Sequence, residues 1–478
     1  MNIMFASSEV APFAKTGGLA DVSAALPKAL SKLGHNVKII MPRYYNINPA
    51  NLEKLPFSIG VPIGGLGTLW AGVYKSYLPG SRVEVYFIDY EEFFGRSGIY
   101  ADENGYSYVD NDKRFIFFTI AVFELALALK FDVDIFHFND WQTAAGTALL
   151  KYRYNWLFPK SKSVLTIHNL EHQGVFSKDA FNYLMIDWSH FNLYEFEAMG
   201  LTNLLKGGIA AADKITTVSP TYAKEIQTPE FGFGLQEHIK AHSYKLVGIL
   251  NGVDYDEWNP KTDKLIPFNY DVENIEIKRK NKLILQERMG LEKNERKCLI
   301  GLVSRFAKQK GIELIAASMV GLLHLNADFV FLGSGEKWAE GFFSDISSRY
   351  ANFRVYVGYN NELAHLIEAG SDIFLMPSMF EPCGLNQMYS LRYGTPPIVR
   401  AVGGLNDTVE NYNPFTKDGT GFKFYDPTRE ALINTTKWAV DSYYKDEGYK
   451  IIQKRGMQKR FSWERSAKEY EKIYKELV

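Results

Sequence analysis

The chain has 478 residues, enough for two or three domains that each bury a sizeable core. Its formal net charge of −1 gives no sign of a nucleic-acid partner or an anionic membrane surface, and two cysteines cannot form a disulfide framework. Glu9 and Lys15 interrupt the first apolar stretch too early for a signal peptide. These features predict a globular protein of a reducing compartment such as the cytoplasm.

Short β-branched and aromatic runs alternate with longer helical patterns along the chain. In the first half, strands are expected at 2–7, 36–42, 83–89, 134–140, 163–169, 214–219 and 246–252. The series restarts later with strands at 298–306, 328–335, 354–359, 372–378, 396–401 and 421–426. Strands that are apolar on both faces and are each followed by a helix indicate parallel sheets between helix layers, so the sequence predicts two doubly wound α/β domains.

Two longer stretches stand apart from this alternation. Residues 115–131 are strongly apolar but contain Glu124 and are too short to span a bilayer, so we expect a buried helix there. Residues 254–296 are polar and charge-rich, with few signs of a packed core. We expect them to connect the two halves and to permit hinging.

Unusual polar residues follow the expected strands. In the first half these are the stretches "KTGGLAD", "HFNDWQTA" and "TIHNLEHQG", and in the second half "SRFAKQKG", "FLGSGE" and "MPSMFEPCGLNQ". Ligands of open parallel sheets bind beyond the carboxyl ends of the strands. These loops, facing a cleft between the two domains, are therefore the predicted site.

The stretch around Lys15, Gly17 and Gly18 joins the first strand to an apolar-periodic helix. Glycine lets the backbone approach a ligand closely, the free N–H groups of a helix start attract anions, and lysine adds a charge suited to phosphate. A tight turn with Lys15 in solvent would use the same residues. The stretch by itself leaves both interpretations open.

Known nucleotide fingerprints do not fit the sequence. There is no Walker-type G-x-x-x-x-G-K-[ST] and no G-x-G-x-x-G, since Trp338 replaces the third glycine of 333–338, which disfavours a nicotinamide oxidoreductase. A diphosphate bound without metal needs side-chain cations and helix N-termini. Arg305 and Lys310 are candidates for this role, although an exposed basic turn would have the same sequence.

Glu381 precedes Gly384 and Leu385, which open a further helix. The first N–H groups of that helix are suited to a second anion or to sugar hydroxyls, and a carboxylate beside them can hydrogen-bond a sugar. The glutamate can equally serve as a simple helix cap. Again the local pattern does not decide between the two.

Taken together, the motifs resemble the bacterial and plastidial glycogen and starch synthases, in the family's order, from residue 2 to about 465. The stretches that carry the resemblance are "KTGGLADV", "HFNDWQTA", "TIHNLEHQG", "SPTYAKEIQTPEFGFGL", "LNGVDYDEWNP", "SRFAKQKG" and "EPCGLNQMYSLRYGTPPIVRAVGGLNDTV". The resemblance implies the GT-B architecture, with two Rossmann-like domains, 1–250 and 251–460, facing across a deep cleft. It also implies that 461–478 packs back on the first domain.

The resemblance further implies the reaction. The expected activity is transfer of glucose from ADP-glucose to the non-reducing end of an α-1,4-glucan, with retention of configuration and without metal or other cofactor. The expected location is the cytoplasm, or a plastid stroma after removal of a transit peptide. With the site divided between two domains, an open form without nucleotide and a more compact form with donor are expected.

The family's roles transfer to matching positions of this sequence. The implied catalytic residues are His168 near the reacting sugar carbon, Arg305 and Lys310 on the diphosphate, and Glu381 on the transferred glucose. The implied substrate-binding residues are Lys15, Gly17, Gly18 and Asp21 for the donor, Gly384 and Leu385 beside Glu381, and Asp140, Trp141 and Tyr100 on the acceptor side.

Two positions depart from the family pattern. Met379 stands where arginine is common, and Val402 stands where threonine usually precedes "GGL". The lost threonine hydroxyl removes a polar contact, while the backbone N–H groups of Gly403 and Gly404 are expected to remain available.

Alternative functions are a GT-B relative with a UDP-sugar or a small acceptor, and a glucan-binding protein without catalysis.

Overall fold

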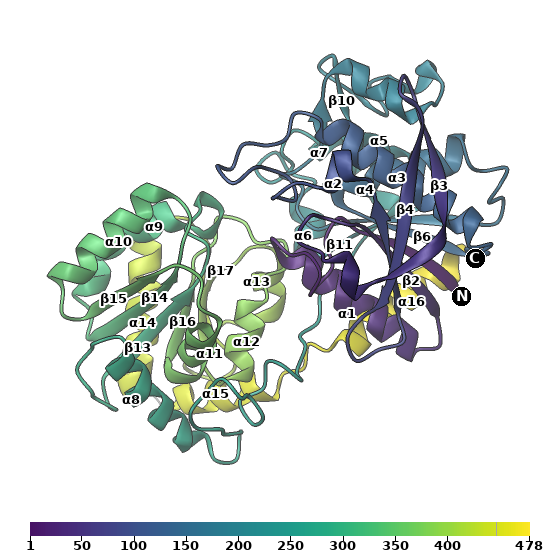
Figure 1. Cartoon of the computed structure of the whole chain (residues 1–478). Helices are drawn as coiled ribbons and strands as arrows, with labels where there is room; N and C mark the ends of the chain where they lie inside the picture. Colours follow the sequence, from purple (N-terminus) through teal and green to yellow (C-terminus); the bar gives the residue numbers. More distant parts are fainter. Residues whose placement is uncertain (446) are drawn as a thin grey trace. The chain divides into compact units, whose positions relative to one another are not determined.

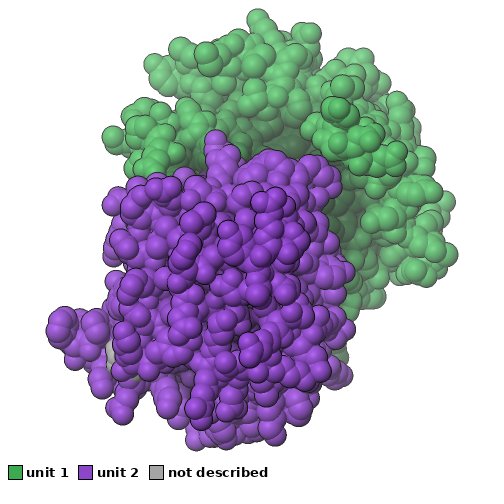
Figure 2. Space-filling view, turned by 90° about the vertical axis from the view of Figure 1, so that its left-hand side faces the viewer, with its two compact units in different colours: residues 1–218, 223–252, 463–478 green, residues 219–222, 253–462 purple. Residues whose placement is uncertain are grey.

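The computed structural model describes residues 1–445 and 447–478, and the chain divides into two compact units, coloured green and purple in Figure 2. Unit 1 consists of Met1–Val218, Ala223–Gly252 and Trp463–Val478. Unit 2 consists of Ser219–Tyr222 and Val253–Ser462. Each unit is built around its own sheet.

Unit 1 contains a nine-stranded sheet in the order β12-β11-β7-β6-β1-β2-β5-β4-β3 (Figure 1). The seven predicted strands of the first half are present and pair in parallel: β1 (Asn2–Ala6), β2 (Asn36–Pro42), β5 (Glu84–Asp89), β6 (Ile135–Asn139), β7 (Lys162–Ile167), β11 (Lys214–Thr217) and β12 (Leu246–Gly248). An antiparallel hairpin, β3 (Glu53–Ile63) and β4 (Gly67–Tyr77), extends the sheet at the β5 edge.

Helices and short elements complete unit 1. The helices are α1 (Gly18–Lys32), α2 (Glu91–Phe94), α3 (Asn111–Ala128), α4 (Asp140–Tyr152), α5 (Leu204–Ala211), α6 (Pro220–Glu225, which begins in unit 2), α7 (Gln236–Ala241) and α16 (Trp463–Leu477). Short 3-10 turns are η1 (Pro49–Asn51), η2 (Lys178–Leu184), η3 (Trp188–His190) and η4 (Ser243–Lys245). A small antiparallel sheet joins β8 (Val175–Phe176), β10 (Leu201–Asn203) and β9 (Glu197–Ala198).

The apolar stretch 115–131 forms most of α3, whose residues are largely buried, as predicted. Across the described residues, no helix is both long enough and apolar enough to cross a membrane. The last helix, α16, packs against α1, and the Tyr474 hydroxyl lies 2.7 Å from His137 Nδ1 beneath the sheet.

Unit 2 contains a fully parallel six-stranded sheet in the order β15-β14-β13-β16-β17-β18. These are the six strands predicted for the second half: β13 (Cys298–Val303), β14 (Ala327–Gly333), β15 (Phe353–Val357), β16 (Ile373–Met376), β17 (Pro397–Arg400) and β18 (Phe422–Phe424). Helical elements flank them: η5 (Ile275–Ile277), α8 (Lys278–Arg288), η6 (Lys308–Lys310), α9 (Ile312–Leu323), α10 (Lys337–Arg349), α11 (Asn361–Gly370), α12 (Asn386–Arg392), α13 (Gly403–Thr408), α14 (Arg429–Lys445) and α15 (Gly448–Gln458).

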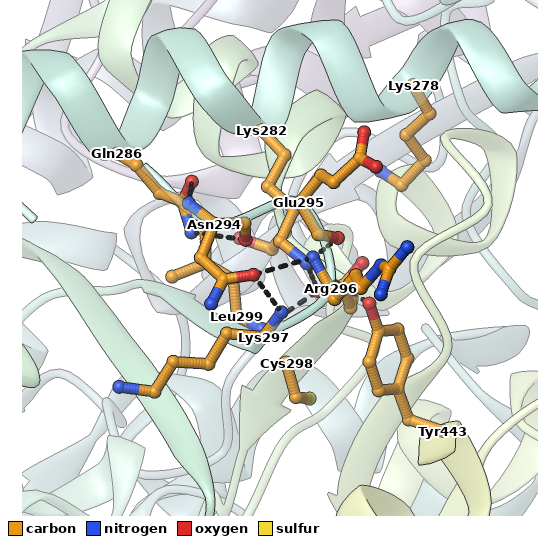
Figure 3. Close-up of polar contacts among 12 residues, drawn as sticks. Lys278, Lys282, Gln286, Asn294, Glu295, Arg296, Lys297, Cys298, Leu299 and Tyr443 are labelled. Atoms are coloured by element: carbon orange, nitrogen blue, oxygen red, sulfur yellow. Dashed lines mark hydrogen bonds and ion pairs between the residues drawn. The ribbon is translucent and has the colours of Figure 1, made fainter. Parts of the chain in front are cut away.

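Residues 254–296 are packed into unit 2, so the expectation of a poorly packed connector is wrong. Helix α8 packs against α11, and several of its polar side chains, among them Lys278, Lys282 and Gln286, are buried together with partners (Figure 3). Lys282 Nζ lies 2.6 Å from Asp372 Oδ2 and donates to the Glu295 carbonyl and the Tyr443 hydroxyl. Lys278 Nζ, fully enclosed, donates to two backbone carbonyls and to the Thr395 hydroxyl. The segment looks polar in sequence because many of its charged residues are exposed and because some of the buried ones are lysines and amides with hydrogen-bond partners.

Candidate active site

The residues expected to form the site lie where the parallel strands end, in both units. In unit 1 they follow β1 (Lys15, Gly17, Gly18, Asp21), β6 (Asp140, Trp141) and β7 (His168), with Tyr100 in the loop between α2 and α3. In unit 2 they follow β13 (Arg305, Lys310) and β16 (Glu381, Gly384, Leu385).

The centre of the unit 2 group is an ion pair between Lys310 and Glu381. Lys310 Nζ lies 2.6 Å from Glu381 Oε2, and the Ser378 hydroxyl donates to the same oxygen at 3.0 Å. Glu381 is only 5% exposed, so its position is fixed by these contacts. Arg305 is exposed and its guanidinium donates to Gln309 at 3.3 Å. The cluster therefore offers two cations for an anion and a fixed carboxylate for hydroxyl groups. Ser378 was not among the predicted residues.

Tight backbone packing surrounds Glu381. Gly384 has φ +70°, and a Cβ on Gly403, at φ +44°, would lie 1.8 Å from the Glu381 carbonyl oxygen. Glycine is required at both positions. The Gly404 N–H donates to the carbonyls of Glu381 and Pro382 at 3.1 and 3.2 Å. The expectation that this N–H stays available for a ligand is therefore wrong, because it closes the turn instead.

A stack of three rings supports helix α12, which follows Glu381 in sequence. The Trp258 ring lies between His365, at 3.8 Å, and Tyr389 of α12, at 3.9 Å and an angle of 2°. Asp263 Oδ2 accepts hydrogen bonds from His365 Nδ1 at 2.8 Å and from the Tyr393 hydroxyl at 2.5 Å. The motif "LNGVDYDEWNP" received no role from the sequence. Its Trp258 packs against α12 and so supports the helix that follows Glu381.

In unit 1, the loop that precedes α1 is open around its glycines. Lys15 Nζ forms an exposed ion pair with Asp21 at 2.7 Å. Gly17 is extended at φ −152°, and no described atom lies within 4 Å of a Cβ built on Gly17 or Gly18. Packing among the described residues does not demand glycine there. The absence of side chains leaves the backbone open to approach.

Asp140 and His168 are held together where β6 and β7 end. Asp140, with φ +54°, accepts the His168 N–H at 2.7 Å, and His168 Nε2 lies 2.9 Å from Asn139 Oδ1. Asn139 donates its own amide to the Ala6 carbonyl, so its oxygen faces His168 and the imidazole proton is on Nε2. Burial lowers the pKa of His168 to about 3. The histidine is therefore neutral at physiological pH.

The two aromatic residues expected on the acceptor side are largely enclosed. Trp141 is 9% exposed and packs edge-on against Phe115 and beside Phe176. Tyr100 is half-buried, and its hydroxyl donates to Glu9 Oε1 at 2.7 Å. Trp141 therefore serves chiefly to pack this part of unit 1. The partner of Tyr100 is Glu9, which the sequence analysis considered only as an interruption of an apolar run.

Asp140 should make stability depend on pH. Burial, with a smaller contribution from the Glu9 charge, raises the pKa of Asp140 to about 7, although backbone N–H donors oppose the shift. Between about pH 4 and about pH 7 this carboxyl is ionised in the unfolded chain but still protonated in the folded one. The folded state therefore loses stability as the pH rises through that range, and the loss is constant above it. The stability gained by Asp140→Asn should therefore be larger at pH 8 than at pH 5, while activity falls.

Thermal unfolding at pH 5, 6, 7 and 8 measures this difference. The matched control is Asp132→Asn, which makes the same substitution at an exposed aspartate of unit 1 and gives the baseline for the pH series. A difference between Asp140→Asn and the wild type that is the same at all four pH values would contradict the raised pKa.

Two doubly wound units with strand-end cations and carboxylates define the GT-B class of glycosyltransferases. The family models agree: the starch synthase catalytic domain matches residues 2–241, and the group 1 glycosyl transferases match 285–458. Glycogen synthase 1 of Geobacter sulfurreducens is 48% identical over 99% of this chain and 96% of its own length. Glycogen synthase of Treponema denticola is 44% identical over 100% and 99%. The chain belongs to the bacterial glycogen synthase family.

Solved structures give the same result. The catalytic domain of Starch Synthase IV from Arabidopsis thaliana, bound to ADP and acarbose, superposes with a TM-score of 0.90 and 33% identity, covering 100% of this chain and 99% of that one. A sucrose-phosphate synthase from Thermosynechococcus elongatus, with a TM-score of 0.62 and 18% identity, shares the fold. The GT-B fold and the glycosyltransferase activity predicted from the motifs are confirmed, and the oxidoreductase and binding-only alternatives are set aside.

Proposed function

We propose that this glycosyltransferase moves glucose from ADP-glucose to the non-reducing end of an α-1,4-glucan with retention of configuration. The observation that carries the proposal is the cluster of Lys310, Glu381 and Ser378, with Arg305 close by in sequence at the end of β13. It combines anion-binding cations with a carboxylate fixed for sugar hydroxyls. ADP and acarbose bound to the Arabidopsis relative support a nucleoside diphosphate and a glucan as ligands of this chain.

The proposed chemistry begins with departure of the diphosphate from the sugar C1. Negative charge grows on the β-phosphate and positive charge on the sugar ring, and fixed cations stabilise such a developing charge strongly. In unit 2 these cations are Lys310 and Arg305. Lys15 of unit 1 is a further cation for the same charge. His168 is neutral, so it contributes hydrogen bonding rather than charge.

Retention follows from either a covalent intermediate or attack from the face that the phosphate leaves. A covalent intermediate needs a free carboxylate below C1. Glu381 Oε2 is already bonded to Lys310 and Ser378, which weakens it as a nucleophile. We therefore propose same-face attack: the acceptor hydroxyl oxygen bonds to C1, the bond from C1 to the phosphate oxygen breaks, and the hydroxyl proton passes to the departing phosphate.

The donor base is tested by comparing nucleotide sugars. Labelled ADP-glucose should be transferred to glycogen far faster than UDP-glucose, and addition of EDTA should leave the rate unchanged, since side chains neutralise the diphosphate. Reactions without glycogen provide the control for hydrolysis. Similar turnover with UDP-glucose would contradict the donor assignment, and loss of activity in EDTA would contradict the metal-free mechanism.

A further inference from the structure

Glu9 is a buried carboxylate at the start of the Lys15 loop. It is 3% exposed, and four donors from two segments converge on it. Its Oε1 accepts the hydroxyls of Thr16 and Tyr100, each at 2.7 Å. Its Oε2 accepts the N–H groups of Thr16 and of Gly17, the latter at 3.2 Å. Both carboxylate oxygens are therefore occupied within the chain.

These contacts limit which groups of the glycine loop can bind an anion. The N–H groups of Thr16 and Gly17 point at Glu9 rather than outward, so they are not free to bind an anion. The loop's own attraction for a phosphate then depends on Lys15 and on the first N–H groups of α1. Backbone hydrogen bonds between Val10 and Ala14, and from Ala11 to the Ala20 carbonyl, hold the ends of the loop. Glu9 holds Thr16 and Gly17 between them.

Tyr100, the other partner of Glu9, is anchored independently. Asn111 donates its side-chain amide to the Tyr100 carbonyl at 2.9 Å, and the fully buried Arg114 donates to the Ile99 carbonyl at 3.0 Å. Both residues belong to the first turns of α3. Glu9 thus joins the glycine loop to Tyr100, whose own backbone is held by the first turn of α3.

We propose that Glu9 is a positioning residue that holds the Lys15–Gly18 loop in register with Tyr100, so that Lys15 meets the donor diphosphate in the right place. The proposal rests on the donor assignment made above. Glu9 is enclosed by its four donors and acts through the loop, not by touching the substrate. Hydrogen bonds to a charged carboxylate are strong, which suits a role in fixing a loop.

Two variants separate geometry from charge. In Glu9→Gln the amide oxygen can accept from the two backbone N–H groups, and the hydroxyls of Thr16 and Tyr100 can turn to accept from the amide N–H₂. All four contacts then survive without the charge. Glu9→Ala removes every one of them. A misplaced reacting group costs on the order of 100-fold in rate, so kcat/KM for ADP-glucose should fall about 100-fold in Glu9→Ala and only a few-fold in Glu9→Gln.

Glu124→Ala is the matched control. Glu124 is a partly buried glutamate in the last part of α3, away from Tyr100, and it accepts a hydrogen bond from the Tyr154 hydroxyl. The substitution should reduce stability without reducing kcat/KM. An equal loss of kcat/KM in Glu124→Ala and Glu9→Ala, or a loss in Glu9→Gln as large as in Glu9→Ala, would overturn the positioning role.

A second measurement does not depend on the donor. Amide hydrogen exchange in the peptide that contains Thr16 and Gly17 should be faster in full-length Glu9→Ala than in the wild type, and unchanged in Glu9→Gln. Unchanged exchange in Glu9→Ala would overturn the inference whatever the substrate. If exchange rises as expected while the wild type fails to use ADP-glucose, the donor assignment is wrong and the positioning of the loop by Glu9 stands.

Discussion

Replacing Lys310 or Arg305 by alanine is expected to lower kcat by about 10²–10³-fold, with a smaller effect on the KM for ADP-glucose. Each change removes a cation whose attraction grows as negative charge accumulates on the leaving diphosphate, so the loss falls on the transition state. Initial rates over a range of ADP-glucose concentrations separate the two parameters. The exposed Lys308, between Arg305 and Lys310, provides the control, since Lys308→Ala should be close to wild type.

The two variants differ in one respect that strengthens the test. Lys310→Ala also leaves the buried Glu381 without its ion-pair partner, whereas the Arg305 guanidinium donates to the neutral side chain of Gln309. Agreement between them assigns the loss to the diphosphate rather than to a disturbed Glu381. An unchanged kcat with a raised KM in both variants would place these cations in ground-state binding and contradict the charge-stabilisation mechanism.

Trp258→Ala is expected to destabilise unit 2 by about 3 kcal/mol, the lower end for a tryptophan truncation because the ring is partly exposed. The change removes both stacking contacts, with His365 and Tyr389, and leaves a gap behind α12. For a unit of this size the unfolding midpoint should fall by roughly 6–12 °C. Trp258→Phe keeps part of the stack and should lose less.

Differential scanning calorimetry measures this effect, and hydrogen exchange in α12 assigns it to unit 2. The control is Trp338→Ala, since that ring is 45% exposed on α10 and its removal should shift the midpoint little. Equal midpoints for Trp258→Ala and Trp338→Ala would show that the ring stack does not support α12.

The strands could be predicted because parallel strands buried on both faces read as uninterrupted apolar runs. The β3–β4 hairpin escaped the same search, since β3 is exposed on alternate residues along its first half. Residues 254–296 were misjudged for a related reason. Lys278 and Lys282 are buried with hydrogen-bond partners, and a search for apolar patterns cannot distinguish such lysines from solvated ones.

The site could be located only in part from the sequence. Strand-end loops are easy to find, but the partners within them are far apart along the chain: 71 residues separate Lys310 from Glu381, and 91 separate Glu9 from Tyr100. Glu9 had no pattern of its own, since a single glutamate in an apolar stretch looks like an interruption. A search for carboxylates within ten residues of a glycine loop would have found it.

Several features stay predictions: the domain boundaries at residues 250 and 460, the roles of the individual site residues, the cleft and its closure on the donor, and a cytoplasmic or plastid location. The closure has a direct test by small-angle scattering with and without ADP and a glucan.

The central claim is that this chain extends α-1,4-glucans with glucose from ADP-glucose, and the fate of the label tests it most directly. Glycogen is incubated with the enzyme and ADP-glucose labelled in the sugar, then digested with β-amylase, which cleaves α-1,4 bonds from non-reducing ends. We expect one ADP to be released per glucose incorporated and nearly all label to be recovered in maltose. Label that resists β-amylase, or ADP released without incorporation into glycogen, would contradict it.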